Sequence, residues 1–321
     1  MTRVVIAGGS GLIGQALTAS LVRDGVSVDV LSRDPARAGR RLPAGARAIA
    51  WDPGNPARAQ ELADVIAGSD AVVNVCGVPV GPLPWTPGRK RAIVASRVDT
   101  NEALVSAIAL LETARRPPVL VSAAGTDGYT GLDAEPATEA SDTSATPGFL
   151  PALGRSWEAA AERAMSFGVR VAMVRTSFVL ARGSDLLAVL ALPVRLGFGG
   201  RYGDGRQWFS WIHLDDLVRV YRRAIDDAGL AGPVNATSPT PCRQVELAAV
   251  LARVLHRPNW FRTPAWLLRL VLRGVSTLVL DSRRVAPARL TEAGFTFAFP
   301  DLEVALADAL GKTDGRLVES R

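Results

Sequence analysis

Short runs of aliphatic residues alternate with helical patterns through the first half of the chain. The runs predicted to be strands are Val4–Ala7, Val26–Leu31, Ala46–Trp51, Ala71–Cys76, Val119–Ala123 and Val169–Arg175. The helical patterns are Leu12–Arg23, Ala57–Ala67, Arg89–Arg115 and Phe149–Phe167. This alternation predicts a parallel sheet with helices on both faces, and the nearly continuous apolar strands agree with burial of both faces.

The second half of the chain is less regular. Helices are predicted over Leu214–Asp227, Gln244–Leu255, Pro264–Arg273 and Leu302–Leu310, and a short strand is predicted at Val234–Ala236. Asp215 or Asp216 is expected to cap the first of these helices. The glycine-rich stretch Leu196–Arg206 is predicted to be a loop at the rim of a cleft. The polar segment 312–321 is predicted to be a flexible tail.

A glycine motif lies between the first predicted strand and the first predicted helix. It reads Gly8-Gly9-Ser10-Gly11-Leu12-Ile13-Gly14, with glycine at every third position from 8 to 14. The first glycine permits a tight turn, the second lets a pyrophosphate approach the backbone, and the third lets the helix pack on the sheet. Free N–H groups at the start of the helix favour an anion. In this context the motif predicts a dinucleotide site.

The end of the second predicted strand indicates which dinucleotide binds. Sites for NAD place an acid there to bind the ribose 2′-hydroxyl. This strand instead ends in Ser32-Arg33, and Asp29 lies earlier, inside the strand. A hydroxyl and a guanidinium can bind a 2′-phosphate. We therefore expect NADP rather than NAD, with Ser32 and Arg33 as its ligands.

Further cofactor contacts are expected at the carboxyl ends of the next strands, where ligands bind in open α/β sheets. Asp52 follows the third strand, and Asn74, Cys76 and Gly77 close the fourth. Gly77 suits a close backbone contact with the ribose or adenine side of the cofactor. Asn74 is equally well explained as a turn residue at the end of the strand.

Composition excludes several other functions. The 321 residues include only two cysteines and two histidines, so neither a disulfide framework nor a zinc cluster is expected, and we predict no metal. The net charge is +6, but the arginines are scattered among acids, and we expect no nucleic-acid partner. No signal peptide and no apolar run long enough to span a bilayer is expected, so a cytoplasmic protein is predicted.

The chain resembles the short-chain dehydrogenase/reductase superfamily, in its atypical extended branch, and more closely the "epimerase family protein" group within it. The stretches that carry the resemblance are Gly8–Gly14, Leu31–Arg33, Asn74–Gly77, Trp85–Pro87, Ser96-Arg97, Phe149-Leu150, Trp157-Glu158, Arg175, Gln207–Asp216, Pro287, Gly294-Phe295 and Phe297. The resemblance covers nearly the whole chain. It implies a Rossmann-type nucleotide-binding domain and a cleft for a small substrate.

The superfamily's chemistry uses a serine, a tyrosine and a lysine four residues after the tyrosine. In that scheme the tyrosine transfers the substrate proton, and the lysine lowers the tyrosine pKa and holds the nicotinamide ribose. This chain has no Tyr-x-x-x-Lys sequence. An ungapped match puts Leu153 at the tyrosine position and Trp157 at the lysine position, and neither side chain transfers a proton.

Other side chains are therefore candidates for the chemistry. Ser122 and Thr126 are expected hydroxyl partners after the fifth strand, and Ser122 is also expected beside the cofactor. Tyr129 is the tyrosine nearest to that strand end and is the candidate proton donor. Arg175 and Gln207 are expected to bind a polar or anionic substrate, and the alternative for Arg175 is an ion pair between the two halves of the molecule.

We therefore predict a doubly wound parallel sheet of the Rossmann type with a smaller C-terminal substrate lobe. The NADP-binding domain is expected to comprise residues 1–175 and about 210–236, and the lobe about 176–209 and 237–311. The predicted function is an NADP-dependent oxidoreductase or epimerase with an atypical active site, acting on an unidentified small molecule. The alternative is a catalytically silent NADP-binding sensor or partner-binding protein. The sequence does not indicate an oligomeric state.

Overall fold

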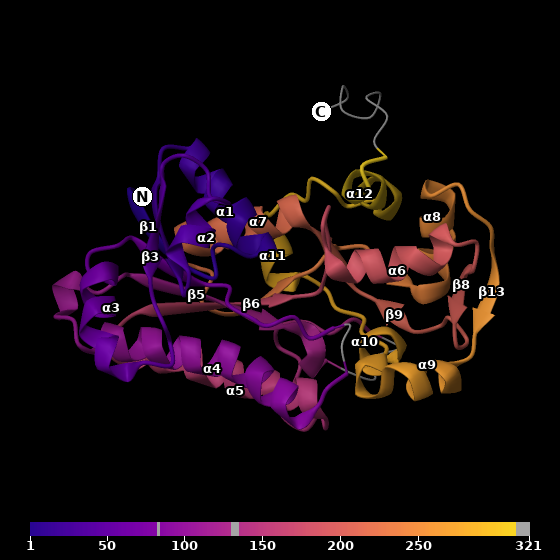
Figure 1. Ribbon diagram of the computed structural model, residues 1–321, viewed down its shortest axis with the longest axis horizontal. Helices are drawn as coiled ribbons and strands as arrows, with labels where there is room; N and C mark the ends of the chain where they lie inside the picture. The colour runs from indigo at the N-terminus through magenta and orange to yellow at the C-terminus, as the bar shows by residue number, and fades with distance from the viewer. Residues whose placement is uncertain (82–83, 130–134, 313–321) are drawn as a thin grey trace.

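The computed structural model of the chain describes residues 1–81, 84–129 and 135–312. A seven-stranded parallel sheet lies at its centre, in the order β11-β6-β5-β4-β1-β2-β3 (Figure 1). The strand order reverses between β1 and β4, as in a doubly wound sheet. The predicted α/β fold is therefore confirmed. The predicted flexible tail lies, apart from Lys312, outside the described residues.

The sheet strands match the apolar runs of the sequence closely. They are β1 (Arg3–Ala7), β2 (Ser27–Ser32), β3 (Ala46–Ala50), β4 (Ala71–Asn74), β5 (Val119–Gly125), β6 (Arg170–Thr176) and β11 (Gly232–Ala236). All neighbouring strands pair in parallel, with Val4 opposite both Val28 and Ala71. The carboxyl ends of the strands consequently meet at one edge of the sheet.

Helices cover both faces of the sheet (Figure 1). They are α1 (Leu12–Arg23), α2 (Pro35–Gly39), α3 (Ala59–Ile66), α4 (Pro87–Ala109), α5 (Phe149–Glu162), α7 (Leu214–Asp226) and α11 (Ala288–Glu292). One apolar core includes Leu17 of α1, Leu217 of α7 and Leu290 of α11. A second core, with α3 and α4, includes Ile66 and Leu104. Burial of apolar side chains on both faces accounts for the continuous apolar strands.

The remaining elements gather at the other end of the molecule, where the carboxyl ends of the strands lie (Figure 1). They are β7 (Phe178–Leu180), α6 (Asp185–Arg195), β8 (Gly199–Tyr202), β9 (Trp208–Phe209), β10 (Trp211–His213), β12 (Cys242–Arg243), α8 (Gln244–Val254), β13 (Asn259–Thr263), α9 (Ala265–Leu272), α10 (Thr277–Leu280) and α12 (Leu302–Ala309). Leu190, Trp211, Leu251 and Leu306 belong to an apolar core of their own.

Two local predictions were wrong. The stretch 196–206, predicted to be a loop, contains β8, which pairs with β13. The glycines there permit close packing rather than flexibility, because a β-carbon on Gly200 would lie 1.6 Å from the carbonyl oxygen of Phe261. The second correction concerns the start of α7. Its N-cap is His213, whose side chain accepts a hydrogen bond from the Asp215 N–H, rather than Asp215 or Asp216.

Candidate functional site

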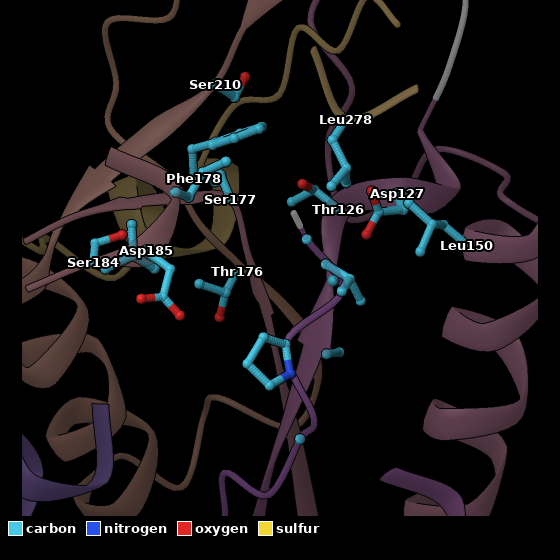
Figure 2. Close-up of a pocket in the computed structure, with 18 of the residues that line it drawn as sticks. Thr126, Asp127, Leu150, Thr176, Ser177, Phe178, Ser184, Asp185, Ser210 and Leu278 are labelled. Carbon is cyan, nitrogen blue, oxygen red and sulfur yellow. The ribbon is translucent and has the colours of Figure 1, made fainter. Parts of the chain in front are cut away.

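A cleft of about 530 Å³ lies at the carboxyl ends of the sheet strands, between the sheet and the C-terminal elements. The predicted site residues that line it are Gly11, Leu12, Ile13, Gly14, Gly77, Thr126 and Gln207. Figure 2 shows Thr126, Asp127 and Leu150 on one wall, facing Ser177, Phe178 and Asp185 on the other. The cleft thus joins the glycine turn to side chains from the second half of the chain.

The glycine turn has the geometry of an anion cradle. Gly8 has a positive φ of 84°, and a β-carbon there would lie 2.7 Å from the Cys76 nitrogen. At Gly14 a β-carbon would meet the Gly8 carbonyl oxygen at 2.4 Å, so this glycine lets the helix pack on the turn. Gly11 is the N-cap of α1, and a β-carbon there would touch only the Gly8 oxygen, at 3.4 Å. The space beside Gly11 is therefore open to a ligand.

No side chain at the start of α1 competes with an anion. Gly11 provides no capping group, and the first turn of the helix holds no acid. Ser10 lies beside Gly11, and its carbonyl oxygen accepts a hydrogen bond from the side chain of Gln15. The N–H groups of Leu12 and Ile13 begin the helix without a side-chain cap. A pyrophosphate fits this end of the helix, because both the free donors and the helix dipole favour negative charge.

The end of β2 offers a cation and a hydroxyl. Arg33 is exposed, and its charge acts on the thiol of Cys76 across the sheet edge. The Ser32 hydroxyl is bonded to the backbone of Asp34. Asp34 is the first acid after the strand, and its carboxylate accepts from the Arg37 N–H as the N-cap of α2. This acid already serves as the cap of the helix.

Asn74 and Ser122 belong to a buried network beneath the cleft rather than to its lining. The Asn74 side chain donates to Asn101 Oδ1 at 2.7 Å and accepts from the Cys76 N–H at 3.1 Å. Asn101 Nδ2 donates to Ser122 Oγ at 3.0 Å and to the carbonyl oxygen of Trp157 at 3.2 Å. The network fixes the chain before Gly77 against α4 and α5.

Cys76 and Asp52 also lie outside the cleft lining. Burial raises the pKa of the Cys76 thiol to about 12, against the opposing effect of the charges of Arg33 and Arg97, so the thiol is not a nucleophile at neutral pH. Asp52 is exposed, and its carboxylate accepts a hydrogen bond from the Gly54 N–H. Its observed role is to hold the turn after β3.

The structure places Tyr129 and Arg175 away from the cleft lining, contrary to expectation. Tyr129 is 2% exposed; its hydroxyl donates to Asn235 Oδ1 at 3.0 Å and accepts from Arg175 Nη1 at 2.5 Å. Arg175 forms two hydrogen bonds with the Glu158 carboxylate, at 2.6 and 2.7 Å. Burial raises the pKa of Tyr129, although the charge of Arg175 opposes the shift. Neither side chain is free to meet a substrate.

A group of charged side chains occupies the cleft instead. Asp127 follows β5, and its carboxylate lies 3.4 Å from Nη2 of Arg283. The same nitrogen lies 3.3 Å from Asp281. Burial raises the pKa of Asp281, and the charge of Asp127 adds to this effect while Arg283 opposes it. Asp127, Asp281 and Arg283 thus form a charged group in the cleft, and its carboxylates can accept a hydrogen bond or a proton from a ligand.

The positions of the missing pair also line the cleft. Leu153 and Trp157 lie on α5, both buried, and they face the cavity with Leu150 and Leu278. Gln207 lines the cleft as predicted, but its amide nitrogen donates to the carbonyl oxygens of Tyr202 and Val279. It therefore fixes the rim of the cleft, while its carboxamide oxygen remains the group that can accept from a ligand.

Several residues of the cleft were not predicted from the sequence. Arg97, Asp127, Asp281 and Arg283 come from three separate segments, and no motif joins them. Arg97 belongs to the Ser96-Arg97 stretch that contributes to the family resemblance, and Asp127 follows the fifth predicted strand. These two positions could therefore have been considered as site residues from the sequence. Among the described residues, no group of His, Cys, Asp and Glu could hold a metal ion, and no helix is long and apolar enough to cross a bilayer.

Comparisons with known proteins agree on one family. The model of the NAD dependent epimerase/dehydratase family matches residues 4–235, and a domain of unknown function (DUF1731) matches residues 263–309. An epimerase family protein of Mycobacterium leprae is 35% identical over 95% of this chain and 95% of its own length. A chloroplastic epimerase family protein of Arabidopsis thaliana, a homolog of SDR39U1, is 34% identical over 94% of this chain and 85% of its own length.

A solved structure is similar over almost the whole chain. The human epimerase family protein SDR39U1, isoform 2, with NADPH, superposes with a TM-score of 0.82 at 28% identity. The match covers 97% of this chain and 100% of the human one.

Proposed function

The chain belongs to the NAD dependent epimerase/dehydratase family, and we propose that it is an NADP-dependent oxidoreductase or epimerase-like enzyme with an atypical active site. One observation carries the proposal: the glycine turn at the start of α1 and the charged side chains Asp127 and Arg283 line the same cleft. A nucleotide held at the turn would therefore extend toward groups that can transfer a proton. The human relative with NADPH supports this choice of cofactor.

The residues of the chain fit a bound dinucleotide. The N–H groups at Leu12 and Ile13 would bind its pyrophosphate, and Ser32 and Arg33 its 2′-phosphate. A nicotinamide cofactor supplies hydride transfer when it is bound. Asp127 and Asp281 would hold the proton that accompanies the hydride, and the apolar side chains of Leu150, Phe178 and Leu278 would exclude water from the substrate.

The cofactor preference is the first test. A charge-assisted hydrogen bond contributes about 1.5–3 kcal/mol, so NADPH should bind at least about tenfold more tightly than NADH. Titration calorimetry with both nucleotides measures this ratio. Arg33→Ala should remove most of the preference by weakening NADPH alone. Equal affinities in the unmutated protein, or tighter binding of NADH, would contradict the assignment of NADP.

The glycine turn is tested by Gly11→Val. The backbone of Gly11 has φ −81° and ψ 175°, which valine adopts readily, and its β-carbon would meet only one atom, at 3.4 Å. The variant should therefore melt near the unmutated temperature but lose NADPH binding, because its methyl groups would occupy the place of the pyrophosphate. Gly14→Val is the matched comparison and should lose stability as well, since its β-carbon would overlap Gly8.

The catalytically silent sensor remains the second candidate, because Leu153 and Trp157 occupy the places of the missing pair. A screen of carbonyl compounds and sugar nucleotides for NADPH oxidation or product formation separates the two functions. Turnover that depends on Asp127 supports the enzyme. If NADPH binds and no substrate is turned over, the sensor becomes the better description.

A further inference from the structure

We propose that Arg97 supplies the positive charge that holds the nicotinamide half of the cofactor, in place of the lysine that the family pattern puts at position 157. The inference rests on the proposed binding of NADP. It concerns a side chain from α4, whereas the lysine of the pattern comes from α5. The positive charge would thus come from a different helix than the lysine but lie in the same part of the cleft.

The protein holds Arg97 by hydrogen bonds to one of its guanidinium nitrogens, but not all of its donors have partners. Nη1 donates to the carbonyl oxygens of Val78 and Ile93 at 3.0 and 3.1 Å, and it contacts the Ser96 hydroxyl at 3.3 Å. The side chain is 9% exposed and lines the cleft. Its Nε atom is buried and has no hydrogen-bond partner. No residue in the described ranges accepts a hydrogen bond from Nη2, so this second donor is available to a ligand in the cleft.

The charge of Arg97 is not neutralised by the protein either. Among residues 1–81, 84–129 and 135–312, no carboxylate forms an ion pair with it, and Asp127 acts on it only through the longer-range field. Burial lowers the pKa of Arg97 to about 10, so the guanidinium still carries its charge at neutral pH. A buried, unpaired cation beside an open cleft favours a ligand with anionic or oxygen acceptor groups.

Two neighbours direct the guanidinium toward the cofactor. Its Cζ atom lies 4.9 Å from the centre of the Trp157 ring, which is the geometry of a cation–π contact. A β-carbon on Gly77 would lie 3.0 Å from Nη2, so only glycine leaves full room for the guanidinium. The Trp157 ring, which stands at the lysine position of the family pattern, therefore packs against the arginine that would take the lysine's role. Gly77 leaves space between Arg97 and the cleft.

The position of Arg97 selects the nicotinamide half. The adenine half is assigned to Arg33, at the end of β2, and the pyrophosphate to the start of α1. Gly77 follows β4, on the other side of β1 from β2, and Leu153 and Trp157 lie beyond it on α5. A dinucleotide that crosses the turn at Gly11 must place its second ribose in this part of the cleft. Ribose hydroxyls and the adjacent phosphate are good acceptors for a guanidinium.

The experiment compares two ligands on matched variants by titration calorimetry. NADPH has both halves, whereas adenosine 2′,5′-bisphosphate has only the adenine half. Arg97→Met should weaken NADPH at least about tenfold and leave the bisphosphate unchanged, and Arg97→Lys should restore part of the loss. Gly77→Ala should weaken NADPH selectively but by less than Arg97→Met, because its β-carbon would push Nη2 away by only a few tenths of an ångström. Arg33→Ala should weaken both ligands.

Arg116→Met is the matched control. Arg116 also stacks on an aromatic ring, that of Phe167 at 5.5 Å, and donates to the carbonyl oxygens of Leu111 and Phe167. It does not line the cleft, so both affinities should stay unchanged. Undiminished NADPH binding by Arg97→Met, or equal losses for both ligands, would overturn the inference while leaving the proposed function standing. Failure of the unmutated protein to bind NADPH would overturn both.

Discussion

Tyr129 belongs to a buried hydrogen-bond network and does not reach the cleft as a proton donor. Its hydroxyl joins Asn235 of β11 to Arg175 of β6, and Arg175 in turn holds Glu158 of α5. The field that would have activated the phenol is present, since Arg175 is in contact with it. Burial nevertheless outweighs that field and raises the pKa of the hydroxyl.

We expect Tyr129→Phe to lower stability without affecting the cofactor. The change removes one oxygen and leaves Arg175 Nη1 and Asn235 Oδ1 without this partner. The free energy of unfolding should fall by about 1–3 kcal/mol. Urea denaturation measures the loss, and NADPH titration should give an unchanged affinity. A large drop in turnover at unchanged stability would restore the catalytic role that the sequence suggested for Tyr129.

Whether a site residue can be predicted from the sequence depends on how far away along the chain its partners lie. Gly11 and Gly14 act within one turn, so their spacing predicts their role, whereas the close approach of Gly8 to Cys76 depends on the fold. Arg97 needs Trp157, and Asp127 needs Arg283; only the folded chain brings these pairs together. No local pattern predicts such contacts, and the substitutions at 153 and 157 indicate only that something else must replace the lost groups.

At the scale of elements, the sheet and its helices follow from periodicity, but the start of α7 does not. His213 is 3% exposed; Nδ1 accepts from the Asp215 N–H and Nε2 lies 3.2 Å from Asp308 of α12. Asp216 is fully buried and accepts from the N–H groups of Ala298 and Phe299. His213 contacts a residue 95 positions away, and Asp216 contacts one 82 positions away. Local sequence therefore does not reveal that the histidine caps the helix and that the aspartate binds another segment.

The N-cap of α7 makes stability depend on pH. Burial lowers the pKa of His213, although Asp215, Asp308 and Asp216 oppose the shift. The unfolded chain therefore takes up a proton near pH 6.5 while the folded chain still resists it, so stability should fall as the pH drops below about 6.5 and stay level above it. Thermal melting between pH 5 and 8 tests this. His213→Asn keeps a capping side chain and should flatten the dependence; an equally steep curve would place its origin elsewhere.

At the scale of the whole molecule, the ion pair of Asp127 and Arg283 joins the two sides of the cleft. Asp127 belongs to the sheet side, and Arg283 lies between α10 and α11 among the C-terminal elements. After β6 the chain leaves the sheet and returns to it only at β11, while β10 pairs with β7 outside the sheet. Composition and periodicity predicted that return through the short apolar run at Val234–Ala236, which forms part of β11.

We expect Asp127→Asn to separate binding from chemistry. The variant keeps the shape of the side chain but removes the charge shared with Arg283. With a substrate identified by the NADPH oxidation screen, turnover should fall by about 10²-fold or more, with NADPH affinity little changed. Asp185→Asn, on the opposite wall, is the control and should have a small effect. Unchanged turnover in Asp127→Asn would remove the acidic pair from the reaction.

The late arrival of β11 also has a consequence for synthesis. Gly232 pairs with Ala172, about 60 residues earlier, so β6 waits as an open edge while the intervening chain is made. At about 5–20 residues per second, this interval lasts roughly 3–12 s. During that time the unpaired N–H and C=O groups of β6 form a template for another strand. The nascent chain is exposed to aggregation during this interval, and a chaperone that covers the edge of β6 should reduce it.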